Sequence, residues 1–169
     1  MSTAPILITG ASGSGTTTLG KALAEKLGAQ HIDADDYYWL PTDPPYRDKR
    51  PADERLKLIL NALSATPSSV VSGSVMGYGA KLEDSFTLIV FLLVETDVRL
   101  ARLRARELRN LGSVDEAFLT WASQYEDGPP EGRSRARHEA WLASRSCPVL
   151  RLEGSGSVED HLDEVVSRL

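Results

Sequence analysis

The stretch that decides the fold runs Ile6-Leu-Ile-Thr-Gly10-Ala-Ser-Gly-Ser-Gly15-Thr-Thr17. Its first three residues form a short, continuous apolar run, which is typical of a strand buried on both faces. A glycine-rich turn follows, and apolar side chains then recur at helical spacing as far as Leu27. Gly28 can end that helix in a left-handed conformation. The stretch therefore predicts a buried strand, a tight turn and a helix in direct succession.

The rest of the chain continues this alternation of strand and helix. Helical patterns separate four further strand-like runs, at 30–32, 69–72, 87–94 and 148–152. Such alternation favours a parallel sheet with helices on both faces. We therefore expect an α/β fold, a three-layer α-β-α sandwich around a five-stranded parallel sheet, in a single domain over residues 1–169. Two polar segments interrupt the pattern, at about 34–50 and about 110–135.

Composition excludes several classes of function. The chain has 169 residues, a net charge of −5 and no lysine- or arginine-rich tail, which argues against a nucleic-acid partner. No run approaches the roughly 20 apolar residues of a membrane span, and the N-terminus lacks the basic start of a signal peptide. The single cysteine, Cys147, cannot form an intrachain disulfide. We expect a cytoplasmic monomer or homodimer without a membrane partner.

The glycine-rich turn carries the clearest chemistry. Gly10, Gly15 and Thr17 match the spacing G-x-x-x-x-G-K-[ST], and the turn lies between a strand and a helix as that motif requires. Successive backbone N–H groups in such a turn can bind phosphate oxygens, and the helix N-terminus adds positive potential. The Thr17 hydroxyl can coordinate Mg²⁺. The predicted ATP-binding residues are Gly10, Ser12, Gly13, Ser14, Gly15, Thr16, Thr17 and Thr18.

Position 16 departs from the motif, because Thr16 stands where a lysine normally neutralises the terminal phosphates. The amide groups and the metal remain, so binding can persist, but catalysis requires another cation. The alternatives are a turn that joins strand to helix without a ligand, with Thr16 and Thr18 as helix-capping residues, or a nucleotide-binding module without turnover.

An acidic cluster follows the second predicted strand. Ligands of open parallel sheets bind beyond the carboxyl ends of the strands, where Asp33 and Asp35 fall. Carboxylates there can hold Mg²⁺ or accept a proton from an attacking hydroxyl group. Alternatively, they lie in a solvated loop or cap a short helix over residues 37–40. The aromatic run at 37–39 could line an acceptor pocket or pack beneath the loop.

Four arginines share one face of a predicted helix. They lie at positions 99, 102, 106 and 109, which places them within a narrow arc at 100° per residue. Like charges on one face repel each other unless an anion opposes them. A triphosphate would serve; the alternative is a solvated helix face.

These features together resemble the adenylate kinase–shikimate kinase group of P-loop kinases, over nearly the whole chain. The chain also looks like bacterial proteins labelled adenylate kinase or ATP-binding protein, which share the loop Gly-Ala-Ser-Gly-Ser-Gly-Thr and an Asp-Pro-Pro-Tyr stretch like that at 43–46. The resemblance implies the P-loop NTPase fold, an acceptor-side insertion at about 34–50 and a mobile lid at about 110–135. The third strand departs from adenylate kinases, since it ends Ser72-Gly73-Ser74 rather than in an acidic sequence.

The resemblance also implies roles for particular residues. Arg102 and Arg106 match a lid pattern in which the first arginine stacks on the base and the second reaches phosphate, and Arg133 and Arg135 resemble a second set of lid arginines. A lid arginine is expected to replace the missing lysine; Lys21 and Lys81 are the other candidates. The predicted catalytic residues are Asp33, Asp35, Arg102, Arg106, Arg133 and Arg135, and the predicted metal ligands are Thr17 and Asp33.

The expected function is transfer of the terminal phosphoryl group of ATP, with Mg²⁺, to a small-molecule or nucleotide acceptor. A nucleotide-binding module with little or no phosphotransfer is the alternative. A GTPase switch fits less well, because the sequence lacks an Asn-Lys-x-Asp motif and an Asp-x-x-Gly after the third strand.

Overall fold

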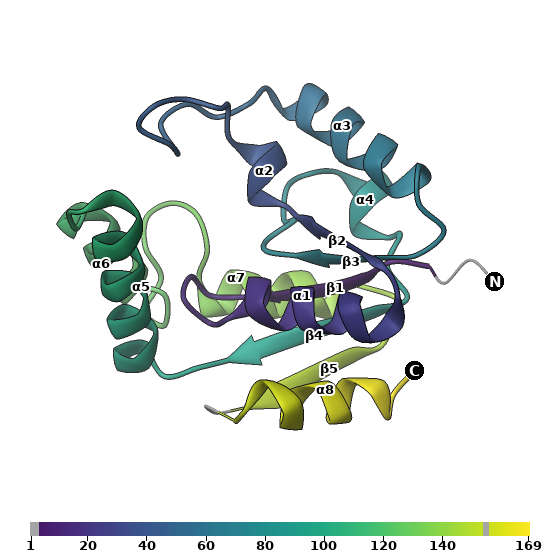
Figure 1. Cartoon of the computed structure of the whole chain (residues 1–169). Coiled ribbons are helices and arrows are strands. Elements are labelled where there is room, and N and C mark those ends of the chain that lie inside the picture. The colour runs from purple at the N-terminus through teal and green to yellow at the C-terminus, as the bar shows by residue number, and fades with distance from the viewer. Residues whose placement is uncertain (1–3, 154–155) are drawn as a thin grey trace.

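A computed structural model describes residues 4–153 and 156–169 of the chain. The expected five-stranded sheet is present, with every neighbouring pair of strands parallel and the strand order β2-β3-β1-β4-β5 (Figure 1). The strands are β1 (Ile6–Gly10), β2 (Gln30–Asp33), β3 (Ser69–Ser72), β4 (Leu88–Leu93) and β5 (Val149–Glu153).

Helices cover both faces of this sheet, which confirms the three-layer arrangement. They are α1 (Thr16–Leu27), α2 (Asp35–Tyr38), α3 (Ala52–Ser64), α4 (Ala80–Glu83), α5 (Thr96–Leu111), α6 (Glu116–Ser123), α7 (Arg135–Ala143) and α8 (Val158–Val166). Helices α1 and α8 pack on one face, while α3, α4 and α7 pack on the other. Among the described residues, no helix has the length and apolar character needed to cross a membrane.

The two-residue period of the strands divides the core into its two layers. In β1, Ile6 and Ile8 face α1 and α8, whereas Leu7 between them faces α3 and α7. All three side chains are buried, so the run is apolar throughout rather than alternating. Burying each such side chain contributes roughly 2 kcal/mol, and this double coverage is why the apolar run at 6–8 predicted the fold.

Most helix boundaries follow local sequence signals. Helix α1 ends as expected at Gly28, whose φ of 63° is left-handed. Helix α7 starts after Ser134, whose side chain accepts a hydrogen bond from the Arg137 N–H and so caps the helix. Gly15, with no side-chain cap, precedes α1, so Thr16 and Thr18 lie inside the first turn and do not cap it.

Because all five strands are parallel, their carboxyl ends meet at one edge of the sheet. The chain leaves β1 toward β2 and β3 on one side, and later crosses to β4 and β5 on the other. Such a change of direction opens a crevice at the strand ends. The loop after β1, the start of α2 and the α5–α6 pair all lie at this end of the molecule (Figure 1).

Candidate nucleotide and acceptor site

The loop between β1 and α1 has the shape of an anion-binding turn. Gly13 and Gly15 have φ angles of 83° and 91°, in a region of backbone conformation that residues other than glycine rarely adopt. The Ser14 side chain folds inward, and its hydroxyl group donates a 2.6 Å hydrogen bond to the Ala11 carbonyl. The first N–H groups of a helix have no intrahelical acceptor, and no side chain caps α1. They are therefore available to an anion at the loop.

Two glycines are required by close packing. A Cβ atom on Gly10 would lie 2.8 Å from the Leu92 carbonyl oxygen, and one on Gly13 would lie 2.7 Å from the Arg99 carbonyl oxygen. Both neighbours are backbone atoms, which cannot move aside as a flexible side chain can. The loop is therefore held between the end of β4 and the first turn of α5.

Asp33, at the end of β2, connects the loop to the acidic cluster. Its Oδ2 accepts a 3.1 Å hydrogen bond from the Thr17 hydroxyl, and its Oδ1 accepts a 3.0 Å hydrogen bond from the Asp35 N–H. Thr17 and Asp33, both predicted as metal ligands, are thus adjacent. A hydroxyl and a carboxylate are the hard oxygen ligands that Mg²⁺ prefers beside phosphates and water. Among the described residues, no group of three or more His, Cys, Asp or Glu side chains could hold a metal alone.

The half-buried Asp35 lies among predicted site residues from three parts of the chain. Burial raises the pKa of its carboxyl group and Asp33 raises it further, whereas Arg133 and Arg106 lower it. The electrostatic effects of Asp33, Arg106 and Arg133 on this carboxyl group indicate that β2, α5 and the segment before α7 direct their predicted residues toward one region.

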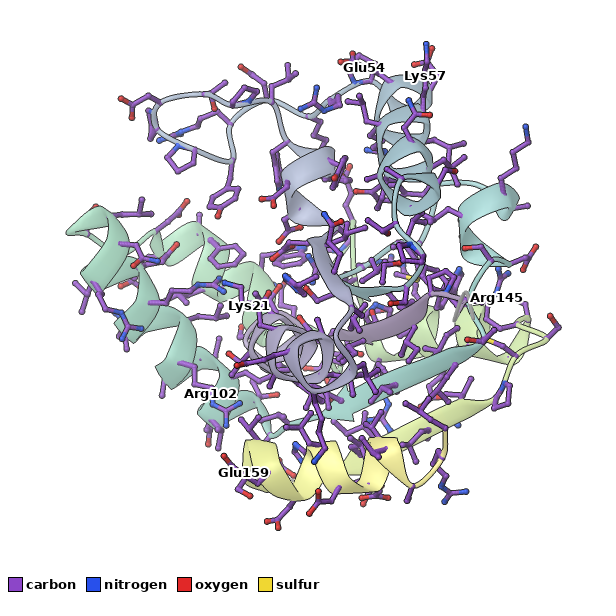
Figure 2. All side chains as sticks on the ribbon, turned by 45° about the vertical axis from the view of Figure 1, so that its right-hand side comes forward. Lys21, Glu54, Lys57, Arg102, Arg145 and Glu159 are labelled. Atoms are coloured by element: carbon purple, nitrogen blue, oxygen red, sulfur yellow. The ribbon has the colours of Figure 1, made fainter. Side chains whose placement is uncertain are left out.

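The other predicted arginines have different surroundings. Arg102 extends from α5 to the loop between β1 and α1 (residues 10–16), called the phosphate loop below, with Nη1 3.5 Å from the carbonyl oxygens of Gly13 and Ser14 (Figure 2). Arg135 forms ion pairs at the start of α7, at 3.3 Å with Glu139 and 3.9 Å with Glu126. Arg102 thus lies at the phosphate loop, and Arg106 and Arg133 act electrostatically on Asp35. Arg135 instead pairs with glutamates.

The prediction that four arginines share one face of α5 is wrong for the first of them, Arg99. Arg102, Arg106 and Arg109 are exposed, but Arg99 is only 1% exposed. The first turn of α5 passes directly beneath the phosphate loop, as the contact with Gly13 shows, so a side chain at this position is covered. Arg99 therefore does not belong to the exposed stripe.

Arg55 and Tyr78 lie next to the predicted site residues, although sequence reasoning missed them. The guanidinium carbon of Arg55 lies 4.6 Å from the centre of the Tyr38 ring and 5.0 Å from that of Tyr78. Its Nε is buried and has no hydrogen-bond partner among the described residues. The Tyr78 hydroxyl group donates a 2.9 Å hydrogen bond to the Ala34 carbonyl, between the two predicted carboxylates. The only sequence signals were an arginine beside the apolar stripe of α3 and a tyrosine flanked by glycines.

The aromatic run at 37–39 packs beneath the loop, as one of the two predictions expected. Tyr37 and Tyr38 pack against the core beneath the loop, and the Tyr38 ring also faces Arg55. Trp39 lies edge-on to Tyr38, with ring centres 4.9 Å apart.

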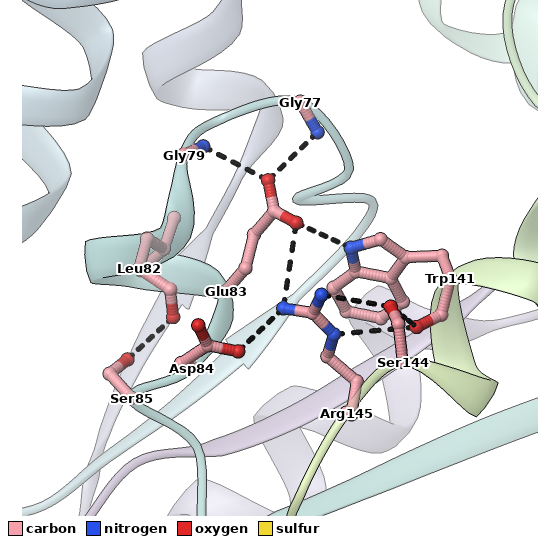
Figure 3. Close-up of polar contacts among 9 residues, drawn as sticks. All are labelled: Gly77, Gly79, Leu82, Glu83, Asp84, Ser85, Trp141, Ser144 and Arg145. Carbon is pink, nitrogen blue, oxygen red and sulfur yellow. Dashed lines mark hydrogen bonds and ion pairs between the residues drawn. The ribbon is translucent and has the colours of Figure 1, made fainter.

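The Glu83 carboxylate binds the loop that carries Tyr78 through several hydrogen bonds (Figure 3). Oε1 of Glu83 accepts hydrogen bonds from both ends of the Gly77–Gly79 turn, at 3.0 and 2.9 Å, and Oε2 accepts one from Trp141 Nε1 at 2.6 Å. The Arg145 guanidinium lies 3.6 Å from the same carboxylate. Glu83, at the end of α4, therefore holds the loop that carries Tyr78, and Trp141 and Arg145 hold Glu83 in turn.

A buried contact joins the segment at 110–135 to α7, through Tyr125 of the segment and His138 of the helix. The Tyr125 hydroxyl group and His138 Nδ1 are 2.8 Å apart. Burial, and then the Arg133 charge, lower the pKa of His138 from 6.5 to about 4. The His138 imidazole is therefore protonated near pH 6.5 in the unfolded chain but only near pH 4 in the folded chain.

We accordingly expect the free energy of unfolding to fall by about 3 kcal/mol through this group as the pH drops across that window. His138→Gln should remove most of this pH dependence, because glutamine does not titrate and can still hydrogen-bond Tyr125. Urea unfolding at pH 7 and pH 4.5 measures the difference. Equal pH dependence in the two proteins would contradict the assignment.

The sheet order, the phosphate loop and the acidic strand end together define the P-loop kinase group. The family model AAA_18, described as an AAA domain, matches residues 6–116, and the chain belongs to this family. It is 42% identical over 174 residues to the uncharacterized protein YqaC of Bacillus subtilis (strain 168), covering 97% of this chain and 96% of that protein.

Two further comparisons involve proteins named as kinases. A cytidylate kinase of Archaeoglobus fulgidus is 31% identical over 120 residues, which cover 64% of this chain and 65% of the relative. A structure of shikimate kinase from Acinetobacter baumannii in complex with shikimate has a TM-score of 0.59 at 18% identity, covering 98% of this chain and 92% of that one. The second likeness concerns the fold alone.

Proposed function

We propose that this protein is an ATP-dependent kinase that phosphorylates a hydroxyl group or phosphate of a small anionic acceptor. The observation that supports the proposal is the Asp33 carboxylate, which joins the Thr17 hydroxyl of the phosphate loop to the N–H of Asp35 through hydrogen bonds of 3.1 and 3.0 Å. The charges of Arg106 and Arg133 act on Asp35 from two other segments. Phosphoryl transfer requires chiefly positioning and charge stabilisation, and this arrangement offers a proton acceptor and two cations within one site.

On the nucleotide side, the amide groups at the start of α1 hold the phosphates of ATP. Thr17 and Asp33 would hold Mg²⁺, which supplies charge neutralisation between phosphate oxygens when bound. Arg102, whose guanidinium already lies beside the loop carbonyls, is our proposed replacement for the lysine absent at position 16. Its planar fork suits phosphate and stays charged.

On the acceptor side, Asp35 takes the proton of the attacking hydroxyl group. The new bond forms between that oxygen and the γ-phosphorus, while the bond from phosphorus to the β–γ bridging oxygen breaks and leaves its electron pair on ADP. Arg106 and Arg133 stabilise the charge on the transferred group. The same two guanidinium groups help to keep Asp35 ionised despite its burial.

An anionic acceptor is favoured by the third arginine of this region. Arg55 is held in place by two aromatic rings, yet its Nε lacks a partner among the described residues. A buried donor of this kind costs free energy unless a ligand satisfies it. A carboxylate or phosphate group of the acceptor would do so.

The second candidate function is a nucleotide-binding module without turnover, which the threonine at position 16 favours. Calorimetry with ATP and Mg²⁺ tests the binding that both functions share. ADP formation over a panel of nucleoside monophosphates and hydroxy acids separates them, since binding without turnover on any acceptor would favour the module.

Thr17→Ala is expected to lower kcat/KM for the best acceptor by at least roughly tenfold, because it removes a proposed metal ligand and the hydrogen bond to Asp33. Titrating Mg²⁺ should show a matching loss of metal affinity. Ser64→Ala, at an exposed site at the end of α3, is the control and should behave as the unmodified protein. Unchanged metal dependence in Thr17→Ala would exclude this role.

A further inference from the structure

Arg99 makes an unusual set of contacts for a buried arginine. Its Nε donates to the Val94 carbonyl at 3.1 Å, and its Nη2 donates to the Thr96 hydroxyl at 3.1 Å. Its Nη1 donates to the carbonyl oxygens of Ser12 at 3.1 Å and Ala122 at 3.5 Å. All four acceptors are neutral. The side chain therefore joins the end of β4, the phosphate loop and α6.

No carboxylate pairs with this guanidinium in the part of the chain that the structure describes. Glu126 is near enough to favour its charge, and the Tyr125 ring lies 5.1 Å from its carbon, but neither forms an ion pair with it. Burial lowers the pKa of Arg99, yet arginine stays protonated in proteins. An unpaired buried charge is costly, and an anion bound on the loop would offset that cost.

The position of Arg99 relates this charge to the loop. Its backbone carbonyl oxygen lies 2.7 Å from where a Cβ atom of Gly13 would be. Its guanidinium donates a hydrogen bond to the carbonyl of Ser12, the residue before Gly13. A carbonyl drawn toward the guanidinium below cannot turn its negative end toward a phosphate above.

We propose that Arg99 is a positioning residue that places a fixed positive charge beneath the phosphate loop, in partial substitution for the lysine that the loop lacks. It holds the Ser12 carbonyl away from the phosphates and adds to the positive potential of the amide groups. This inference rests on the proposed function only in that the loop binds a polyphosphate. It concerns affinity for charge, not the chemistry of transfer.

Calorimetry with ATP, ADP and inorganic tripolyphosphate, each with Mg²⁺, tests the proposal. Arg99→Gln should lower the affinity for ATP and tripolyphosphate by roughly tenfold. The affinity for ADP should fall by less, because the effect follows the charge of the ligand. Arg104→Gln removes one charge from the exposed side of the same helix, where Arg104 pairs with Glu116 at 2.8 Å, and should leave all three affinities unchanged. An equal ATP affinity in Arg99→Gln and the unmodified protein would overturn the proposal.

Two more variants separate charge from structure. Adding Thr16→Lys to Arg99→Gln should recover most of the ATP affinity, because a lysine there supplies the lost charge; a merely structural defect would not be recovered. Should Arg99→Gln fail to fold, Arg99→Lys keeps the charge and should bind ATP within about threefold of the unmodified protein. A folded Arg99→Lys that has lost ATP binding would reject the role. Unmodified protein that binds none of the ligands would instead reject the proposed function.

Discussion

Asp35→Asn is expected to lower kcat by roughly 10³-fold with little change in ATP affinity. The carboxylate is the proposed proton acceptor, and general base catalysis contributes factors of this size, whereas the phosphate loop stays intact. Steady-state kinetics with the best acceptor, together with ATP calorimetry, measure the two quantities. Because burial raises the pKa of Asp35, the acidic limb of the kcat/KM profile should lie above the usual range of an aspartate and should disappear in the variant.

Asp36 offers a matched control for this experiment. It is the next residue in α2 and carries the same charge, but it is exposed. Asp36→Asn should therefore retain kcat within about twofold, as is usual for exposed positions. Equal losses in the two variants would indicate that the negative charge of the segment matters rather than a proton acceptor at position 35.

Gly13→Ala should abolish detectable ATP binding and lower the free energy of unfolding by about 3 kcal/mol. The new Cβ would lie 2.7 Å from the Arg99 carbonyl oxygen, and the residue would also be forced to keep a φ of 83°. Left-handed backbone costs a residue other than glycine about 1–3 kcal/mol, and the clash adds to that cost. The loop can relieve the clash only by moving its amide groups. Calorimetry and urea unfolding measure the two effects.

Gly28→Ala separates backbone strain from the clash. Gly28 also has a positive φ, of 63°, but no atom lies within 4 Å of the place where its Cβ would be. This variant should lose about 1 kcal/mol of unfolding free energy, because an alanine there must keep a left-handed backbone, and it should bind ATP normally. Normal ATP binding by Gly13→Ala would contradict the close packing of the loop on α5.

The parts that sequence predicted well are those encoded over short stretches. The run at 6–17 contains in order its strand, its turn and its helix start, so periodicity and glycine spacing suffice to find them. The placement of Asp33 and Asp35 also follows, because parallel strands end at one edge. The five-stranded parallel sheet was predictable for the same reason.

The parts that sequence could not predict depend on contacts between distant segments. Arg99 and Arg102 are both arginines of one helix. The approach of α5 to the loop buries Arg99 and leaves Arg102 exposed. Arg55 meets Tyr78 only when α3 and the loop after β3 pack together. No periodicity within either segment indicates such a meeting.

The two hydrogen bonds of the Asp33 carboxylate have a consequence for the order of events. One oxygen holds the hydroxyl group of Thr17, and the other holds the N–H of Asp35. A metal that drew this carboxylate toward itself while both hydrogen bonds held would also shift the backbone of Asp35, the proposed proton acceptor. In the proposed kinase, loading of the nucleotide and docking of its co-substrate would then be energetically linked, and each would change the affinity for the other by the same factor.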